Sequence, residues 1–255
     1  MKSRNSLLPL IPVITSFRPV VALAALAALT SGASAASIIW GTATNVAADT
    51  DIATDGTSVA ALNFGSSTDE IINGVTFKGY TLVTGSGSTT TYDVTNPAAG
   101  TWGNNFFTGY LKPSALSAGS AYATALSTGS YFNGQGNTGT ETLSGLTVGQ
   151  EYEIQVWYND ERSTNGTDTM TFGSGTSNPT VVLTSNPSLV TSQFAIGTFT
   201  ADNIQQTLTF KEGTSKSGAT INMFQIRAVP EPSAIISLVG GLGMLLGVRR
   251  RRLMN

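Results

Sequence analysis

Apolar and polar residues alternate with a period of two in several short stretches of the chain, and no long helical period is present. The clearest stretch is Glu151–Tyr158, in which every second residue is apolar. Its apolar face consists of Tyr152, Ile154, Val156 and Tyr158. The other face is polar except for Trp157. Because successive side chains of a strand point to opposite faces, the pattern predicts a strand with its apolar face in the core.

Further segments rich in Thr, β-branched and aromatic residues are predicted to be strands. They are Ser37–Trp40, Ser58–Phe64, Gly74–Phe77, Tyr80–Thr84, Asp168–Phe172, Thr180–Thr184, Phe194–Thr200, Gln206–Lys211 and Thr220–Arg227. Turn residues separate them, and Asn73-Gly74 is a typical hairpin turn. One short helix is expected at Ala115–Thr128, although Gly119 disfavours it. Short strands joined by turns predict an all-β fold, a sandwich or a barrel, in one domain.

Both ends of the chain look like targeting signals. The first 20 residues contain Lys2, Arg4 and Arg18 and no acid, and the apolar run Val20–Leu29 follows. Ala33-Ser34-Ala35 then provides small residues at the two positions that signal peptidase reads. Ten apolar residues are too few to span a bilayer. We therefore expect residues 1–35 to be a secretory signal peptide that is cleaved after Ala35, with cleavage after Ala36 as the alternative.

The C-terminal end has a different order of features. Val229-Pro230-Glu231-Pro232 precedes Ser233–Val248, a stretch without charge, and Arg249, Arg250, Arg251 and Arg252 follow it. A helix over residues 233–248 would be about 24 Å long, near the lower limit for a transmembrane span. Four arginines favour the cytoplasmic side, so the rest of the chain would lie outside. An ordinary tail anchor would have the same features.

This order of motif, apolar helix and basic cluster resembles the PEP-CTERM sorting signal of exported bacterial proteins. The resemblance covers residues 229–255 and implies that Pro230, Glu231 and Pro232 are read by an exosortase-type membrane enzyme. It further implies export through the secretion machinery and anchoring in the membrane by the C-terminal helix. The protein would then reach the cell surface or the extracellular matrix.

Composition excludes several classes of site. The chain of 255 residues has no Cys and no His, so it forms no disulfide, no Cys or His nucleophile system and no His-ligated metal centre. Residues 36–228 contain six Lys and Arg against 14 Asp and Glu, a net charge of −8. Such a charge argues against nucleic acid and polyanionic ligands, and it is compatible with neutral glycans or divalent cations.

The body, residues 36–228, has a second and looser resemblance. It lies in the order of these segments: Trp40-Gly41, Asp51 to Thr57, Asn63-Phe64-Gly65, Asn73 to Phe77, Leu143 to Leu146, Gly149 to Tyr152 and Asn222 to Arg227. This order is similar to that of exported PEP-CTERM proteins with galactose-binding-like jelly-roll bodies. The resemblance implies a single antiparallel, jelly-roll-like β-sandwich, a fold shared with many carbohydrate-binding modules.

Two segments are candidate binding sites. Asp49, Asp51 and Asp55 lie in one acidic loop, and a structural calcium ion would need such oxygen ligands. The spacing does not match that of an EF-hand loop, and a solvated acidic loop explains these residues without a metal. Jelly rolls of the resembled class often hold a structural calcium ion.

The second candidate follows the strand Glu151–Tyr158. Trp157, Tyr158, Asp160 and Arg162 combine aromatic rings with polar groups where the strand enters a loop, which suits an extracellular polysaccharide. Core packing of the two rings and an ion pair between Asp160 and Arg162 would explain the same residues without a ligand.

Paired carboxylates are the remaining catalytic device, and Glu151 and Glu153 lie about 7 Å apart on one strand face. Strand alternation explains them without catalysis. We therefore expect a non-enzymatic surface or matrix protein that binds carbohydrate; a hydrolase with a carboxylate pair and a purely structural matrix component are the alternatives. Threonine pieces such as Thr207-Leu208-Thr209 resemble ice-binding arrays, but they do not recur at a fixed interval. A regular threonine face is therefore not predicted.

Overall fold

The computed structural model describes residues 36–81, 89–96, 105–132, 138–160, 167–175, 179–186, 188–213 and 218–230. All of these residues belong to one unit, Ala33–Asn255, whereas the other unit, Met1–Gly32, lies outside the described residues. So do the predicted cleavage site at Ala33 and Ala35, the motif residues Glu231 and Pro232, the apolar segment 233–248 and the four arginines. Within the described part of the chain, no helix has the length and apolar character needed to cross a membrane.

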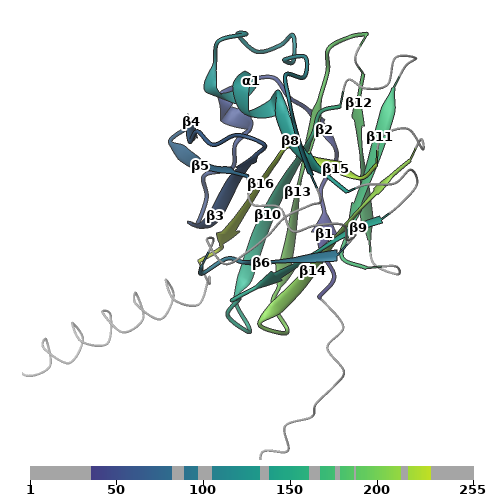
Figure 1. Cartoon of the computed structure of the whole chain (residues 1–255). Coiled ribbons are helices and arrows are strands. Elements are labelled where there is room, and N and C mark those ends of the chain that lie inside the picture. The colour runs from purple at the N-terminus through teal and green to yellow at the C-terminus, as the bar shows by residue number, and fades with distance from the viewer. Residues whose placement is uncertain are drawn as a thin grey trace, which may run out of the picture. The chain divides into compact units, whose positions relative to one another are not determined.

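The described residues form an all-β fold with three sheets and one short α-helix (Figure 1). The large sheet has the order β1 (Ile39–Trp40), β13 (Gln193–Thr200), β10 (Glu151–Tyr158), β16 (Met223–Ala228), β3 (Thr57–Phe64), β5 (Val75–Tyr80) and β4 (Glu70–Ile72), and β2 (Thr44–Asn45) also pairs with β13. The second sheet has the order β12 (Thr180–Ser185), β11 (Asp168–Gly173), β14 (Gln205–Glu212), β9 (Thr138–Ser144) and β6 (Thr89–Asp93). The small sheet consists of β15 (Thr220–Ile221), β8 (Thr128–Tyr131) and β7 (Asn105–Thr108).

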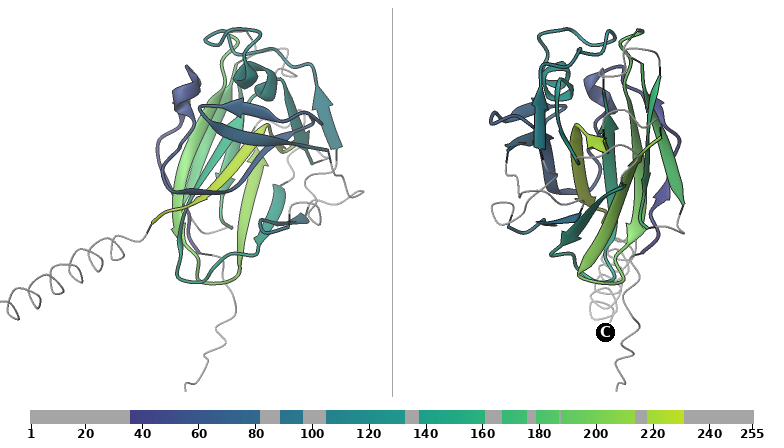
Figure 2. Two further views of the ribbon diagram at one scale, coloured as in Figure 1. Left: turned by 90° about the vertical axis from the view of Figure 1, so that its left-hand side faces the viewer. Right: turned by 45° about the vertical axis from the view of Figure 1, so that its right-hand side comes forward.

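The large and second sheets enclose the main core. Buried residues from both sheets form one cluster, which includes Ile154 and Val156 of β10, Phe224 of β16, and Phe172 and Phe210 of the second sheet. The alternation in Glu151–Tyr158 is confirmed: Tyr152, Ile154, Val156 and Tyr158 all belong to this cluster. The two layers are visible in Figure 2.

The expectation of purely antiparallel sheets is wrong at two positions. β3 pairs with β5 in parallel, and β6 pairs with β9 in parallel. The first case arises because β4 lies at the sheet edge and β5 returns antiparallel to it, between β4 and β3. The sheets are therefore mixed, and the coarser prediction of an all-β sandwich holds.

Local turn chemistry predicted the β4–β5 hairpin correctly. Asn73 and Gly74 connect the two strands with φ angles of 48° and 77°. Two successive left-handed residues define the type I′ turn, which Asn-Gly favours. The separate strand expected at Tyr80–Thr84 is wrong at its start, because Tyr80 is the last residue of β5.

The predicted helix is much shorter than expected. α1 spans only Ala121–Leu126, and Ser120 caps it by accepting a hydrogen bond from the Ala123 N–H at 3.2 Å. Thr128, which the prediction placed in the helix, begins strand β8. The helix contributes Tyr122, Ala125 and Leu126 to a second hydrophobic cluster on the outer face of the large sheet.

Candidate ligand-binding face

The residues predicted to bind calcium lie in a loop that is hydrogen-bonded to side chains of the large sheet. Asp49 and Asp51 belong to the 3₁₀ turn η1 (Asp49–Asp51), and the Asp51 carboxylate accepts the N–H groups of Ala47 at 2.7 Å and Ala48 at 3.0 Å. Asp55 is exposed. The described residues contain no group of three or more acidic side chains arranged to hold a metal ion. The calcium site therefore stays a prediction without support from the geometry.

A guanidinium lies where that loop presents its carbonyl oxygens. Arg227 donates from Nε to the carbonyl of Asp55 at 2.6 Å and from Nη2 to those of Thr54 and Gly56 at 2.7 and 2.9 Å. Gln155 exchanges two further hydrogen bonds with the loop, donating to the Asp51 carbonyl and accepting from the Ala53 N–H. The loop is thus fixed to the sheet by protein side chains, and four of its carbonyl oxygens already accept hydrogen bonds.

Of the two roles that the sequence left open for Trp157, core packing and display to a ligand, the structure shows core packing. Trp157 is fully buried, and its Nε1 donates a 2.7 Å hydrogen bond to the Tyr122 hydroxyl of α1. Phe77 of β5 meets the ring edge to face at 5.7 Å, and Phe194 lies 6.3 Å away. The ring is covered because α1 packs on this outer face of the large sheet and Phe77 of β5, a strand of the same sheet, also contacts it (Figure 1).

The neighbours of Trp157 in the predicted site are also buried. Tyr158 and Asp160 have no exposed surface, and Arg162 lies outside the described residues. The Asp160 main chain is fixed to Ser185, whose hydroxyl accepts the Asp160 N–H and donates to the Asp160 carbonyl, both at 3.0 Å. This segment therefore belongs to the core in the described structure, as the packing alternative proposed.

The carboxylate pair Glu151 and Glu153 lies on one strand of the large sheet, as predicted. Both residues are half-buried on the same strand, β10, and Glu153 lies in register with Arg227 of β16. Burial raises the pKa of Glu153, with a contribution from Asp55, while Arg227 opposes the shift. A catalytic role for this pair stays a prediction from the sequence.

The outer face of the second sheet contains a threonine face that the sequence did not predict. Strand register places Lys211 between Thr171 and Thr138. The next row places Thr209 between Gly173 and Thr140. A third row consists of Thr207, Thr142 and Thr91. We define the threonine face as these residues together with Thr180; neighbouring members lie about 4.8 Å apart across the strands and about 6.7 Å apart along them.

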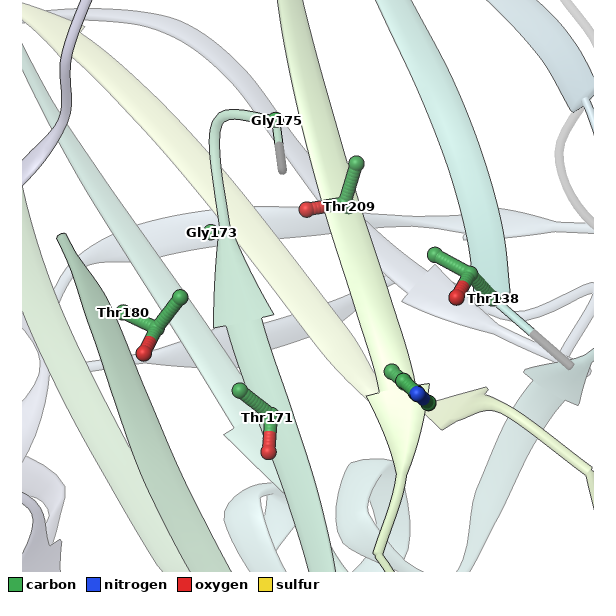
Figure 3. A pocket seen from close by; sticks show the side chains of 7 residues that line it. Thr138, Thr171, Gly173, Gly175, Thr180 and Thr209 are labelled. Carbon is green, nitrogen blue, oxygen red and sulfur yellow. The ribbon is translucent and has the colours of Figure 1, made fainter. Parts of the chain in front are cut away.

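A hollow of about 260 Å³ opens at one end of this face. Its lining comprises Thr138, Thr171, Gly173, Gly175, Thr180, Thr209 and Lys211. Figure 3 shows that the threonine side chains come from several strands and that Gly173 lies between Thr180 and Thr209. A Cβ atom at Gly173 would lie only 2.9 Å from Thr180 Cγ2 and 3.3 Å from Thr209 Oγ1. The missing side chain therefore keeps this hollow open.

Three of the four acids on the described strands of the second sheet point away from the threonine face, and the fourth, Asp93, lies at the far end of β6. Glu141 of β9, Asp168 of β11 and Glu212 of β14 are all buried. Glu141 accepts a hydrogen bond from Thr90 Oγ1, and burial raises its pKa well above the ordinary value. Glu212 accepts the Gly218 N–H at 3.0 Å. Among the described residues of the threonine face, hydroxyls and the Lys211 ammonium are the only side-chain polar groups.

A local signal for this face existed in the sequence. Threonine occupies alternate positions in three segments: Thr138–Thr142, Thr169–Thr171 and Thr207–Thr209. Alternation predicts that each set lies on one face of its own strand. That the sets share a face depends on pairing between strands distant in sequence, so a search for a fixed interval could not find it.

Comparison of the chain with protein-family models, with curated proteins and with solved structures finds no match. The similarity of the body to galactose-binding-like jelly rolls, and of residues 229–255 to a PEP-CTERM signal, therefore stays a prediction from the sequence.

Proposed function

We propose that this chain is an exported cell-surface or matrix protein whose β-sandwich binds polysaccharide at the threonine face. The observation that carries the proposal is the in-register arrangement of threonines around an open hollow on the second sheet. Fixed strands position these side chains, which reduces the conformational entropy lost when a ligand binds. The proposal moves the carbohydrate site from Trp157 to the opposite outer face of the sandwich.

The chemistry of the rows suits a sugar chain. A threonine hydroxyl both donates and accepts hydrogen bonds, as sugar hydroxyls do, and its methyl group contacts the apolar C–H groups of a sugar ring. The strand spacing of about 4.8 Å is similar to the length of one pyranose residue in an extended chain. If a polysaccharide lies across the strands, each successive sugar would therefore lie over the next strand and contact the outward side chain of that strand. Each hydrogen bond contributes only about 1 kcal/mol, so binding depends on several rows acting together.

Export and sorting complete the proposed role. The segment ending in Ala33-Ser34-Ala35 would direct secretion, and Pro230-Glu231-Pro232 would direct an exosortase-type enzyme to the C-terminal tail. The apolar segment 233–248 would hold the protein in the membrane until that step. Mass spectrometry of surface material tests this sorting: we expect mature chains to begin at Ala36 or Ser37 and to lack residues 249–255. An intact C-terminus would leave only a permanent tail anchor.

The binding proposal is tested with the full chain in mild detergent and a panel of soluble polysaccharides. Isothermal titration should detect at least one ligand, and Thr209→Val should weaken that ligand several-fold because the substitution removes one central hydroxyl and keeps the side-chain shape. Thr76→Val is the matched control, since Thr76 is an exposed threonine on β5 of the large sheet. Equal weakening by both variants, or no binding to any polysaccharide, would overturn the proposal and favour a purely structural matrix component.

A further inference from the structure

The negative charge of the body is not spread evenly over the second sheet. Glu141, Asp168 and Glu212 lie on its strands, but all three point inward and are buried. Asp93, at the end of β6, is the acid on the outward-facing positions of the described strands, and it lies in register with Ser144. Six residues of strand separate Ser144 from Thr138, the cross-strand neighbour of Lys211, which is about 20 Å. The hollow is therefore locally positive within an acidic protein.

Lys211 differs from the other cations in the described part of the chain. Lys78 forms an ion pair with Asp69 at 2.5 Å, and Lys112 donates to the Ala118 carbonyl at 2.6 Å. Arg227 is buried and donates to three carbonyl oxygens. Lys211 is exposed, and none of the described carboxylates lies within ion-pair distance of it. Its ammonium group is thus available to a ligand at the edge of the hollow.

Resting on the proposed polysaccharide function, we infer that the ligand is an anionic polysaccharide whose acidic group binds Lys211. Thr171 and Thr138 flank Lys211 on the two neighbouring strands, each about 4.8 Å away from β14, so a hydroxyl donor lies on either side of the lysine. This row matches an anionic group that accepts several hydrogen bonds at once, and charge-assisted hydrogen bonds are the strong ones. The neighbouring row with Thr209 and Thr140 then contacts the hydroxyls of the adjoining sugars.

The net charge of −8 for residues 36–228 argues against polyanions only when the ligand meets the whole surface. Charges separated by more than about 8–10 Å are largely screened at physiological salt. The distance of about 20 Å along the strands between the Asp93 row and the Lys211 row exceeds that length. The local charge of the hollow therefore decides the sign of the ligand, and the ligand chain must stay on the threonine face to avoid the acids elsewhere.

Two pairs of polymers test the inference and separate carboxylate from sulfate chemistry. Polygalacturonate is compared with its fully methyl-esterified form, and dextran sulfate with dextran, each titrated into the full chain in mild detergent. We expect an acidic member to bind about tenfold tighter than its neutral partner, and Lys211→Gln to remove that difference. Lys78→Gln is the control, because it makes the same change in net charge at an exposed lysine of the large sheet.

The outcomes separate this inference from the proposed function. A preference for an acidic polymer that Lys211→Gln removes and Lys78→Gln retains supports the inference, and the polymer pair that shows it identifies the acidic group. Equal binding of the acidic and neutral members, unchanged by Lys211→Gln, overturns the inference and leaves the polysaccharide function in place. A preference that both lysine variants weaken equally would show general charge attraction and would also overturn it. Binding of none of the four polymers, nor of any in the wider panel, overturns the proposed function itself.

Discussion

The outer face of the large sheet is covered around Trp157 by α1 and the η1 loop, whereas the outer face of the second sheet carries an open hollow. Both faces come from strands with alternating sequences. On β10 the outward side chains Gln155 and Trp157 are fully buried, whereas on β14 the outward side chains Thr207 and Thr209 are partly exposed. The comparison shows that alternation separates the two sides of a strand, while connecting segments decide which side remains available to a ligand.

The largest difference between the faces is expected at Trp157. Trp157→Ala should lower the free energy of unfolding by about 3–5 kcal/mol, because it removes a buried ring and leaves the Tyr122 hydroxyl without its donor. Trp157→Phe should cost less, since most of the apolar volume remains. Urea denaturation of the full chain measures both. A small loss of stability together with weaker polysaccharide binding would return Trp157 to the role of a ligand platform.

The attachment of the η1 loop to the large sheet is the next test. Arg227→Met keeps much of the apolar stem but removes the three hydrogen bonds to the carbonyls of Thr54, Asp55 and Gly56. We expect a loss of about 2–3 kcal/mol, because hydrogen bonds from a charged donor to partly buried carbonyls are replaced by nothing. Adding calcium should not restore the lost stability. A rescue by calcium would instead support a metal site at Asp49, Asp51 and Asp55.

Local rules explain which parts of the fold the sequence could predict. The apolar face of Glu151–Tyr158 and the Asn73-Gly74 turn depend on residues close in sequence, and both predictions are confirmed. The parallel pairing of β3 with β5 depends on which strand lies at the sheet edge, and no local pattern encodes that order.

The candidate site was also predictable only where it depends on residues close in sequence. The burial of Trp157 depends on Tyr122 and Phe77, which lie far from it in the sequence, so a single tryptophan on a polar face was compatible with packing or display. The threonine face was missed for the corresponding reason, because its rows join Thr91, Thr142 and Thr207 from three separate strands. The sequence predicts which residues of a strand share one face. Pairing between strands distant in sequence determines which of those faces form the site.

The inner side of the second sheet gives a pH-dependent test. Burial raises the folded-state pKa of Glu141 well above the ordinary value of 4.5. The unfolded chain therefore loses this proton first, and the stability is fully present below about pH 4.5 and falls as the pH rises toward the folded pKa, by at most about 1.4 kcal/mol per pH unit. Glu141→Gln should remove this fall and make the variant more stable than the natural protein at pH 8 but not at pH 4.

Urea denaturation at pH 4, 6 and 8 measures the effect of Glu141→Gln. Other carboxyl groups contribute to the pH dependence of the natural protein, so the informative quantity is the difference between variant and natural protein at each pH. Glu151→Gln is the control, because Glu151 is partly exposed on the large sheet. If the difference for Glu141→Gln stays constant over this range, Glu141 is ionised in the folded protein and its environment is more polar than the structure indicates.

The smallest effect on stability is expected on the threonine face itself. Thr207→Val should change the free energy of unfolding by no more than about 0.5 kcal/mol, because Thr207 is partly exposed and valine keeps the β-branched shape that strands favour. Thr128→Val is the matched buried case: its single hydroxyl proton lies between two acceptors, Asn63 Oδ1 at 3.1 Å and the Ala125 carbonyl at 3.2 Å from Oγ1. That substitution removes a buried hydrogen-bond donor that these acceptors share and should cost about 1–3 kcal/mol. Chemical denaturation measures the free energy of unfolding of both variants. It therefore compares the loss of a hydroxyl that is hydrogen-bonded within the protein with the loss of one that is exposed to a ligand. Equal costs would mean that the threonine face is packed against another surface in solution, and the polysaccharide would then have no open face to bind.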